Sequence, residues 1–215
     1  MKHLPSDPAV AIVAKKDSIL RAGRSLFLHH GIRKVRVEDV CADAHVSKRT
    51  FYKYFRNKDE LAVAVFSELF ESGRVRLETV LVMDCPIEEK FRKIMEVKSK
   101  LAAETSALFY REALDSSTLP GQFALQEQRK WEQRVRQFYV DAQANGQIRA
   151  DIHIDVLMAL LVSSRALMKD AELTGLVRDF PSLVETVMSI FFYGILPRSP
   201  KEEKSKIQRT ERNKL

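Results

Sequence analysis

The sequence has 215 residues, of which 45% are hydrophobic and 30% charged, with seven glycines and seven prolines. These proportions exclude a low-complexity chain and favour a globular protein built of long helices with brief breaks. The net charge of +7 is unevenly spread, since residues 1–66 carry +6, residues 67–197 carry −3 and residues 198–215 carry +4. Basic ends on a mildly acidic body indicate that a phosphate-bearing partner would meet the ends and not the body.

Residues 1–10 are expected to form a flexible arm, because two prolines interrupt it. Apolar residues then recur at helical spacing over about residues 11–30, and Gly31 follows where a helix would stop. His29 and His30 are adjacent, which raises the possibility of a metal site. Neighbouring helical residues point about 100° apart, so a helix end is the favoured interpretation.

A second helix is expected over residues 37–44, and a tight turn leads to a third that begins at Ser47. Around this third helix Phe51, Tyr54 and Phe55 fall on one side. The opposite side carries Lys48, Arg49, Tyr52, Lys53 and Arg56. Two short helices joined by a tight turn and preceded by a longer helix constitute a helix-turn-helix.

The basic side of the third helix has two interpretations, an ordinary solvated charged surface and a face that binds an anion. The preceding helix, the tight turn and the charge asymmetry favour the second. Arginine or lysine can donate to guanine O6 and N7, and a tyrosine ring can contact a thymine methyl group. The sequence therefore predicts double-stranded DNA as a partner.

The stretch VEDVCADAHVSKRTFYKYFRNKDEL resembles the DNA-binding domain of the TetR (tetracycline repressor) family of bacterial transcriptional regulators, and the resemblance covers about residues 15–65. It departs from the family at His45, where a glycine is usual and a left-handed backbone is needed. The predicted DNA-contacting residues are Arg36, Ser47, Lys48, Arg49, Thr50, Tyr52, Lys53, Tyr54 and Lys58. The resemblance implies six of them: Lys48, Arg49 and Tyr52 at the major groove, Thr50 at its edge, and Tyr54 and Lys58 near phosphates. Arg36 replaces the usual Ser or Thr before the second helix, so a phosphate contact is gained there and a cap is lost.

Helical periodicity continues through the rest of the chain. Helices are expected over residues 58–81, 87–114, 122–144, 156–171 and 181–196. The predicted fold class is all-α, with an N-terminal three-helix helix-turn-helix domain followed by a helical ligand-binding and dimerisation bundle. The predicted domains are residues 1–10 (flexible arm), 11–60 (DNA binding), 61–197 (effector binding and dimerisation) and 198–215 (basic disordered tail).

The two cysteines and the distribution of apolar residues bear on the compartment in which the protein is expected to occur. Cys41 and Cys85 belong to no CxxC or Cys/His cluster, which argues against zinc and suits a reducing compartment. Cys41 is interpreted as a small core residue. No signal-peptide core or membrane-spanning run is recognised, so the protein is expected to be cytoplasmic and to have no membrane partner.

Sequence patterns for metals and catalysis are weak. Asp151, His153 and Asp155 alternate around the connector that precedes the helix expected over residues 156–171, but without a fourth ligand a solvated loop and helix cap is favoured over a metal site. No Glu-x-x-His pair, phosphate-binding glycine-rich loop or nucleophile with a base is recognised. We therefore expect neither metal nor cofactor, and no enzyme.

The last two helices are apolar on more than one face, so something beyond their own core must cover them. A twofold four-helix bundle with a second copy would do so, and the resemblance implies the same mode of dimerisation. The predicted interface residues of this homodimer are Leu157, Leu161, Met168, Leu183, Val187 and Phe191.

The body is also predicted to hold a small effector, apolar or amphipathic. The candidate pocket residues are Phe109, Trp131, Phe138, Tyr139 and Met158, for which plain core packing is the alternative. The leading hypothesis is a dimeric transcriptional regulator, a repressor that binds a palindromic operator and is released by the effector. An architectural DNA-binding module without an effector is the second hypothesis.

Overall fold

The computed structural model describes residues 8–196, with side chains from residue 13 onward. Within this range the chain forms helices and no strands, which confirms the all-α class. The helices are α1 (Pro8–His30), α2 (Val37–Asp43), α3 (Lys48–Tyr54), α4 (Lys58–Leu81), α5 (Ile87–Ala103), α6 (Ala107–Ala113), α7 (Leu119–Ala144), α8 (Ile154–Lys169), α9 (Ala171–Leu176) and α10 (Phe180–Ile195).

The two predicted terminal segments lie mostly outside the described residues. Helix α1 begins at Pro8, so the last three residues of the predicted arm are helical. Proline suits the first turn of a helix, because its missing N–H would have no partner there. The basic tail predicted for residues 198–215 is not among the described residues.

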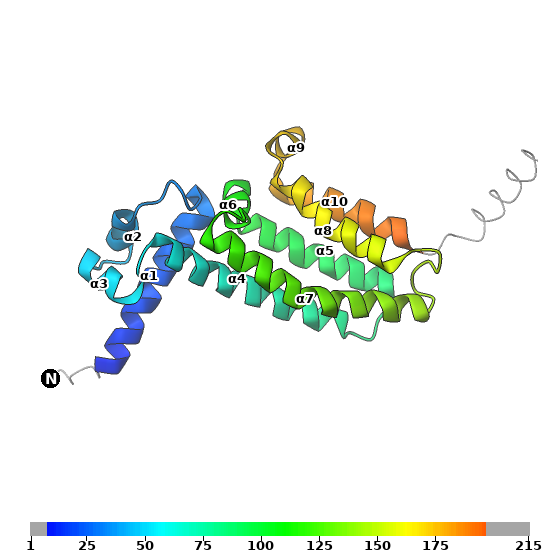
Figure 1. Ribbon diagram of the computed structural model, residues 1–215, viewed down its shortest axis with the longest axis horizontal. Helices are drawn as coiled ribbons and strands as arrows, with labels where there is room; N and C mark the ends of the chain where they lie inside the picture. The colour runs from blue at the N-terminus through cyan, green and yellow to red at the C-terminus, as the bar shows by residue number, and fades with distance from the viewer. Residues whose placement is uncertain (1–7, 197–215) are drawn as a thin grey trace, which may run out of the picture.

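Helices α1 to α3 gather at one end of the molecule, and the remaining helices form an elongated body (Figure 1). One core holds the first end together, and Ile19, Phe27, Phe51 and Leu61 are fully buried in it. The core continues along α4 as far as Leu69 and also takes in residues of α6. The core of the N-terminal end therefore continues along α4 beyond residue 60, the predicted domain boundary.

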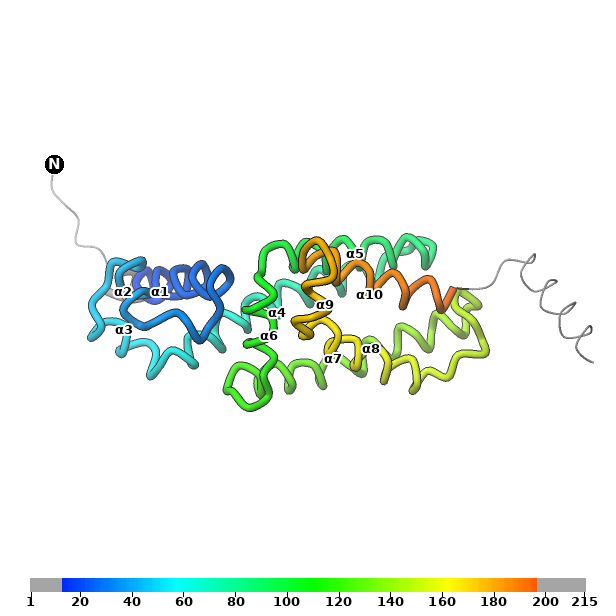
Figure 2. Tube along the Cα trace, turned by 90° about the horizontal axis from the view of Figure 1, so that it is seen from above, coloured from blue at the N-terminus to red at the C-terminus, as the bar shows by residue number. Residues whose placement is uncertain are grey.

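Helix α4 also enters the second core, through residues near its C-terminal end. Figure 2 shows α5 and α10 along one side of the body, with α7 and α8 along the other. A stacked pair of rings, Phe91 on α5 and Phe192 on α10, lies 4.3 Å apart between centroids. A rigid helix shared by both cores ties the position of the N-terminal end to the packing of the body.

The helix predicted over residues 87–114 is broken in the structure into α5 and α6. The Thr105 hydroxyl donates to the carbonyl of Leu101 at 3.1 Å, and the Ser106 hydroxyl accepts from the amide of Phe109 at 3.1 Å. Such side-chain bonds to the backbone compete with continued helix, and Ser106 caps the new one. The break frees α6 to turn toward α1.

Helix α7 begins three residues earlier than predicted, because Thr118 caps it by accepting from the amide of Gly121 at 3.3 Å. A Cβ atom on Gly121 would lie 1.9 Å from the carbonyl oxygen of Asp115, so this turn requires glycine. The short helix α9 was not predicted. Asp170 starts it by accepting from two amides, at 2.8 and 3.1 Å.

Candidate functional site

The turn between α2 and α3 fixes the orientation of the short basic helix. His45 has φ = 53°, so it adopts the left-handed conformation that the sequence required at this position. Ser47 then caps α3, its hydroxyl accepting from the amide of Thr50 at 3.1 Å. Phe51 is fully buried and Phe55 is 3% exposed, so one side of α3 is anchored in the N-terminal core.

The opposite side of α3 is open to solvent. Lys48, Arg49 and Lys53 are exposed, and the Tyr52 side chain retains 54% of its accessible area. Thr50 and Tyr54 are half-buried at the edges of this surface. The predicted separation of an inward aromatic side from an outward basic side is therefore present, with the cations on a helix that a duplex can approach.

An ion pair that the sequence did not reveal holds Lys48. Its ammonium contacts the carboxylate of Glu38 in the first turn of α2. This bond holds the pKa of Glu38 below its usual value and raises the pKa of Lys48. Any phosphate or base that contacts Lys48 must compete with Glu38, whereas no such pair restrains Arg49 within the described residues.

Two of the predicted contact residues also have structural roles. The Arg36 amide donates to the carboxylate of Asp39 at 2.8 Å, so α2 keeps one half of a capping box although Arg36 itself offers no cap. The Lys58 ammonium donates to the carbonyl oxygens of Val35 at 2.8 Å and Arg33 at 3.1 Å. Lys58 therefore braces the α1–α2 loop, and only its remaining hydrogen is available to a phosphate.

The body contains a cavity of about 280 Å³ between α4, α5, α6, α7, α8 and α10, which is partly open to solvent. Trp131, Phe138 and Tyr139 line it, as predicted. Phe109 does not, because α6 turns it into the N-terminal core, where it is 2% exposed. Met158 packs in the body core without lining the cavity. These two residues are corrections to the predicted pocket.

The cavity also contains polar side chains that the prediction missed. Lys98 of α5, Arg165 of α8 and Tyr110 of α6 line it among mainly apolar residues. Burial raises the pKa of the Tyr110 hydroxyl, which therefore stays protonated at neutral pH. A sequence signal for Lys98 existed, because it stands four residues after Ile94 and three before Leu101 on the apolar side of its helix.

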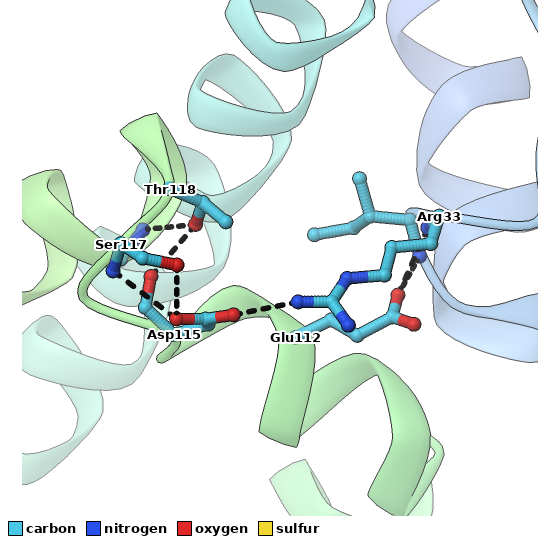
Figure 3. Close-up of polar contacts among 7 residues, drawn as sticks. Arg33, Glu112, Asp115, Ser117 and Thr118 are labelled. Carbon is cyan, nitrogen blue, oxygen red and sulfur yellow. Dashed lines mark hydrogen bonds and ion pairs between the residues drawn. The ribbon is translucent and has the colours of Figure 1, made fainter.

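Helix α6 joins this cavity to α1. The Glu112 carboxylate accepts from the amides of Ile32 at 2.5 Å and Arg33 at 2.9 Å, just after α1 ends. Figure 3 shows Glu112 facing the backbone at Arg33, and the Arg33 guanidinium reaching the carboxylate of Asp115 at 2.6 Å. The Ser106 amide also donates to the carbonyl of Leu28 at 3.0 Å. We call these contacts the α1–α6 junction.

The α1–α6 junction is tightly packed as well as hydrogen-bonded. Gly31 has φ = +80°, and a Cβ atom there would lie 2.8 Å from Leu108 and 2.9 Å from the Glu112 carboxylate. Only glycine meets both conditions easily. A displacement of α6 therefore acts directly on the end of α1.

The predicted dimer interface needs correction. Leu157, Met168 and Leu183 are 3–6% exposed within the protomer and leave almost no area for a partner. Leu157 and Met168 pack into the core of the body. Leu161, Val187 and Phe191 are half-buried against the same core. The five most exposed large apolar residues of α8 and α10 form what we call the apolar stripe: Val156, Leu160, Leu167, Ile190 and Tyr193, which are 46–72% exposed.

The connector that raised the question of a metal is occupied by ion pairs. The Asp155 carboxylate meets Arg136 of α7 at 2.6 Å, and Arg149 donates to both oxygens of Asp151, at 2.9 and 2.6 Å. No group of three or more potential metal ligands occurs within residues 8–196. Within the same range, no helix is both long and apolar enough to cross a bilayer.

Comparison with known proteins gives a family for this arrangement. The family model described as bacterial regulatory proteins, tetR family, matches residues 19–65, which run from α1 into α4. Transcriptional regulator AcuR of Cereibacter sphaeroides is 28% identical over 151 residues, covering 65% of this chain and 68% of that protein. The chain belongs to the TetR family. The HTH-type transcriptional repressor DhaR of a Mycobacterium species is 24% identical to this TetR-family regulator. The match covers 69% of this chain and 77% of DhaR.

Solved structures of low sequence identity share the fold of this TetR-family regulator. FadR from Bacillus halodurans superposes with a TM-score of 0.66 at 18% identity, covering 89% of this chain and 97% of that one. FadR from Bacillus subtilis, solved in complex with stearoyl-CoA, gives 0.67 at 16% identity, with 83% and 98% covered. The relatives are transcriptional regulators and not enzymes, and the chain is accordingly a DNA-binding regulator.

Proposed function

We propose that this TetR-family regulator is a repressor that binds a palindromic operator as a homodimer and is released when a small molecule fills the body cavity. The observation that carries this proposal is helix α6. Its Tyr110 lines the cavity, and its Glu112 holds the end of α1. A ligand that prefers one position of α6 would bias the position of the DNA-binding end.

The basic side of α3 is the proposed DNA-reading surface. Arg49 and Tyr52 are exposed on this surface. Lys48 becomes available to DNA when its ion pair with Glu38 breaks. A helix with this outward side fits a major groove, where guanine offers two acceptors to an arginine. Lys53 and Arg36 contribute charge for phosphates on either side.

The apolar stripe is the proposed dimer interface. Leu160 and Leu167 of α8 lie seven residues apart, and Ile190 and Tyr193 of α10 lie three apart, so each helix presents one apolar line. A second copy that supplies the same two helices would complete a four-helix bundle and cover both lines. Two α3 helices held in this way can enter successive major grooves about 34 Å apart.

The fold supports ligand binding in the body. FadR from Bacillus subtilis, which has this fold, was solved in complex with stearoyl-CoA. At 16% identity the likeness carries the fold and not the ligand. The apolar cavity and its route to α1 are what favour an effector over the second hypothesis, an architectural module without one.

Selection from random-sequence duplex tests the proposed function. The protein is mixed with a random library, the retained DNA is sequenced, and the recovered motif is placed in a fluorescence anisotropy assay. We expect a palindrome with half-sites centred about 10 base pairs apart or a multiple of this spacing. Equal binding to the motif and to random duplex of the same length would favour the architectural module.

Replacing Arg49 by alanine should weaken binding to the selected operator by about tenfold or more, the loss expected for a bidentate base contact. The residue is exposed, so the fold should be unaffected. Lys100→Ala is the matched control, because it removes one exposed cation from the last turn of α5 in the body. Equal losses for the two variants would show that α3 contributes only general charge.

A further inference from the structure

Two cations enter the apolar cavity without an acidic partner. Lys98 makes no ion pair or hydrogen bond within residues 8–196. The Arg165 guanidinium donates one hydrogen bond, to the side-chain oxygen of Gln128, which is neutral. Ionised groups in an apolar site are costly unless an opposite charge or several hydrogen bonds compensate them.

A third cation in the cavity wall, unlike these two, has an acidic partner. Arg74 of α4 donates two hydrogen bonds to Glu71, at 2.8 and 2.6 Å, so its charge is already balanced. Burial lowers the pKa of Arg165, and the neighbouring Tyr110 and Glu132 oppose this shift. No hydrogen bond or ion pair joins Arg165 to Glu132 among the described residues. Lys98 and Arg165 therefore leave positive charge in the cavity that nothing in its wall neutralises.

We infer that the cavity binds an amphipathic organic anion whose acidic headgroup lies between Lys98 and Arg165 and whose apolar tail lies against Trp131 and Phe138. The inference rests on the proposed function, since it names the chemical class of the effector. It is carried by the two cations that lack an acidic partner, by the apolar side chains around them and by the volume of the cavity.

The size and polarity of the cavity narrow the class further. A volume of about 280 Å³ lies near the lower end of small-molecule pockets, which begin at roughly 300 Å³. Leu69, Leu77 and Val135 add to the apolar wall. A single headgroup with a short aliphatic or aromatic tail fits this arrangement, because the charge of Arg165 acts on Lys98 and the two cations can therefore share one anion.

The ionisation of Lys98 supports an anion and predicts its pH dependence. Burial, with the nearby Arg165 charge, lowers the pKa of Lys98 to about 8. An anion beside it would raise that pKa, so binding takes up a proton and must weaken as pH rises through about 8. Of the other ionisable groups lining the cavity, Tyr110 and Tyr139 have raised pKa values and stay neutral there, and Arg74 stays paired with Glu71.

Matched probes test the headgroup. Octanoate and 4-phenylbutanoate are each compared with the primary amide of the same tail, and octyl phosphate tests whether the acid is a carboxylate or a phosphate. Trp131 is the single tryptophan and lines the cavity, so its fluorescence reports occupancy. We expect at least one anion to bind about tenfold or more tightly than its neutral counterpart at pH 7.

Variants locate the anion. Lys98→Met and Arg165→Met should each weaken binding of the anion about tenfold and leave binding of the amide unchanged. Arg74→Met is the matched control, because it removes a cation of the same cavity that Glu71 already balances. From pH 7 to pH 9 the wild type should lose about tenfold in affinity, and Lys98→Met should lose that dependence.

Three outcomes would overturn the inference: anions that bind no better than their amides, equal losses from Lys98→Met and Arg74→Met, or no binding of any anion at millimolar concentration. Release of the selected operator is measured separately. Release by neutral compounds alone would keep the proposed function and remove this inference. Binding of anions without any release would keep the site and remove the effector role.

Discussion

Replacing Ile190 by aspartate will separate the homodimer and lower operator affinity by about 100-fold or more. Ile190 is 72% exposed in the protomer, so the change leaves the core of the body intact. Twofold symmetry places the new carboxylate in the interface twice, where an unpaired buried charge costs several kcal/mol. Sedimentation velocity should give a monomer, and the monomer cannot place two α3 helices on one operator.

Val82→Asp is the matched control for this result. Val82 is 66% exposed at the C-terminal end of α4, outside the apolar stripe, and receives the same charge. It should remain dimeric and bind the operator normally. An Ile190→Asp protein that still sediments as a dimer would place the interface elsewhere.

The error in the predicted interface has a physical origin. Helices α8 and α10 are apolar on several sides, so their periodicity does not tell which side meets the protomer's own core. Leu157 and Leu160 are only three residues apart, yet the first is 3% exposed and the second 58%. The sequence alone predicts that these two helices carry more apolar surface than one core can cover. Which side of each helix faces solvent is known only once the neighbouring helices are placed.

Local signals placed other elements well. Helix α4 has the predicted bounds, because Asn57 caps it by accepting from the amide of Glu60 at 2.8 Å. The buried and exposed sides of α3 also follow from helical spacing alone. The break before α6 was missed because Leu101 and Leu108 are seven residues apart, so the apolar pattern passes through it unchanged.

Contacts between distant segments could not be predicted. Glu112 lies 80 residues after Ile32 in the chain, and nothing in either neighbourhood indicates that they meet. The pairing of Lys48 with Glu38 likewise depends on the angle between α2 and α3. Trp131, Phe138 and Tyr139 were predicted to line the pocket, but the presence of Arg165 in the same pocket depends on how α8 packs against the other helices of the body.

Replacing Glu112 by alanine will separate ligand binding from operator release. The change removes the acceptor for the Ile32 and Arg33 amides, and Ile32 is 5% exposed, so its N–H loses its partner in a nearly closed site. Charge-assisted bonds of this kind stabilise by roughly 1.5–3 kcal/mol, so the free energy of unfolding should fall by about this amount in denaturant titrations. Ligand affinity, read from Trp131 fluorescence, should change little, because Glu112 does not line the cavity.

The decisive measurement is the ligand concentration needed to release operator, which should rise about tenfold if α6 carries the coupling. Arg33→Ala is the control, because it breaks only the exposed pair with Asp115 and should cost less than about 1 kcal/mol. Glu112→Gln retains an acceptor oxygen and replaces the alanine variant if that variant is too unstable to measure. The ligand concentration at which it releases operator should lie between those of the wild type and Glu112→Ala. Release at the wild-type ligand concentration by both Glu112 variants would mean that the signal reaches the DNA-binding end through α4 and not through the α1–α6 junction.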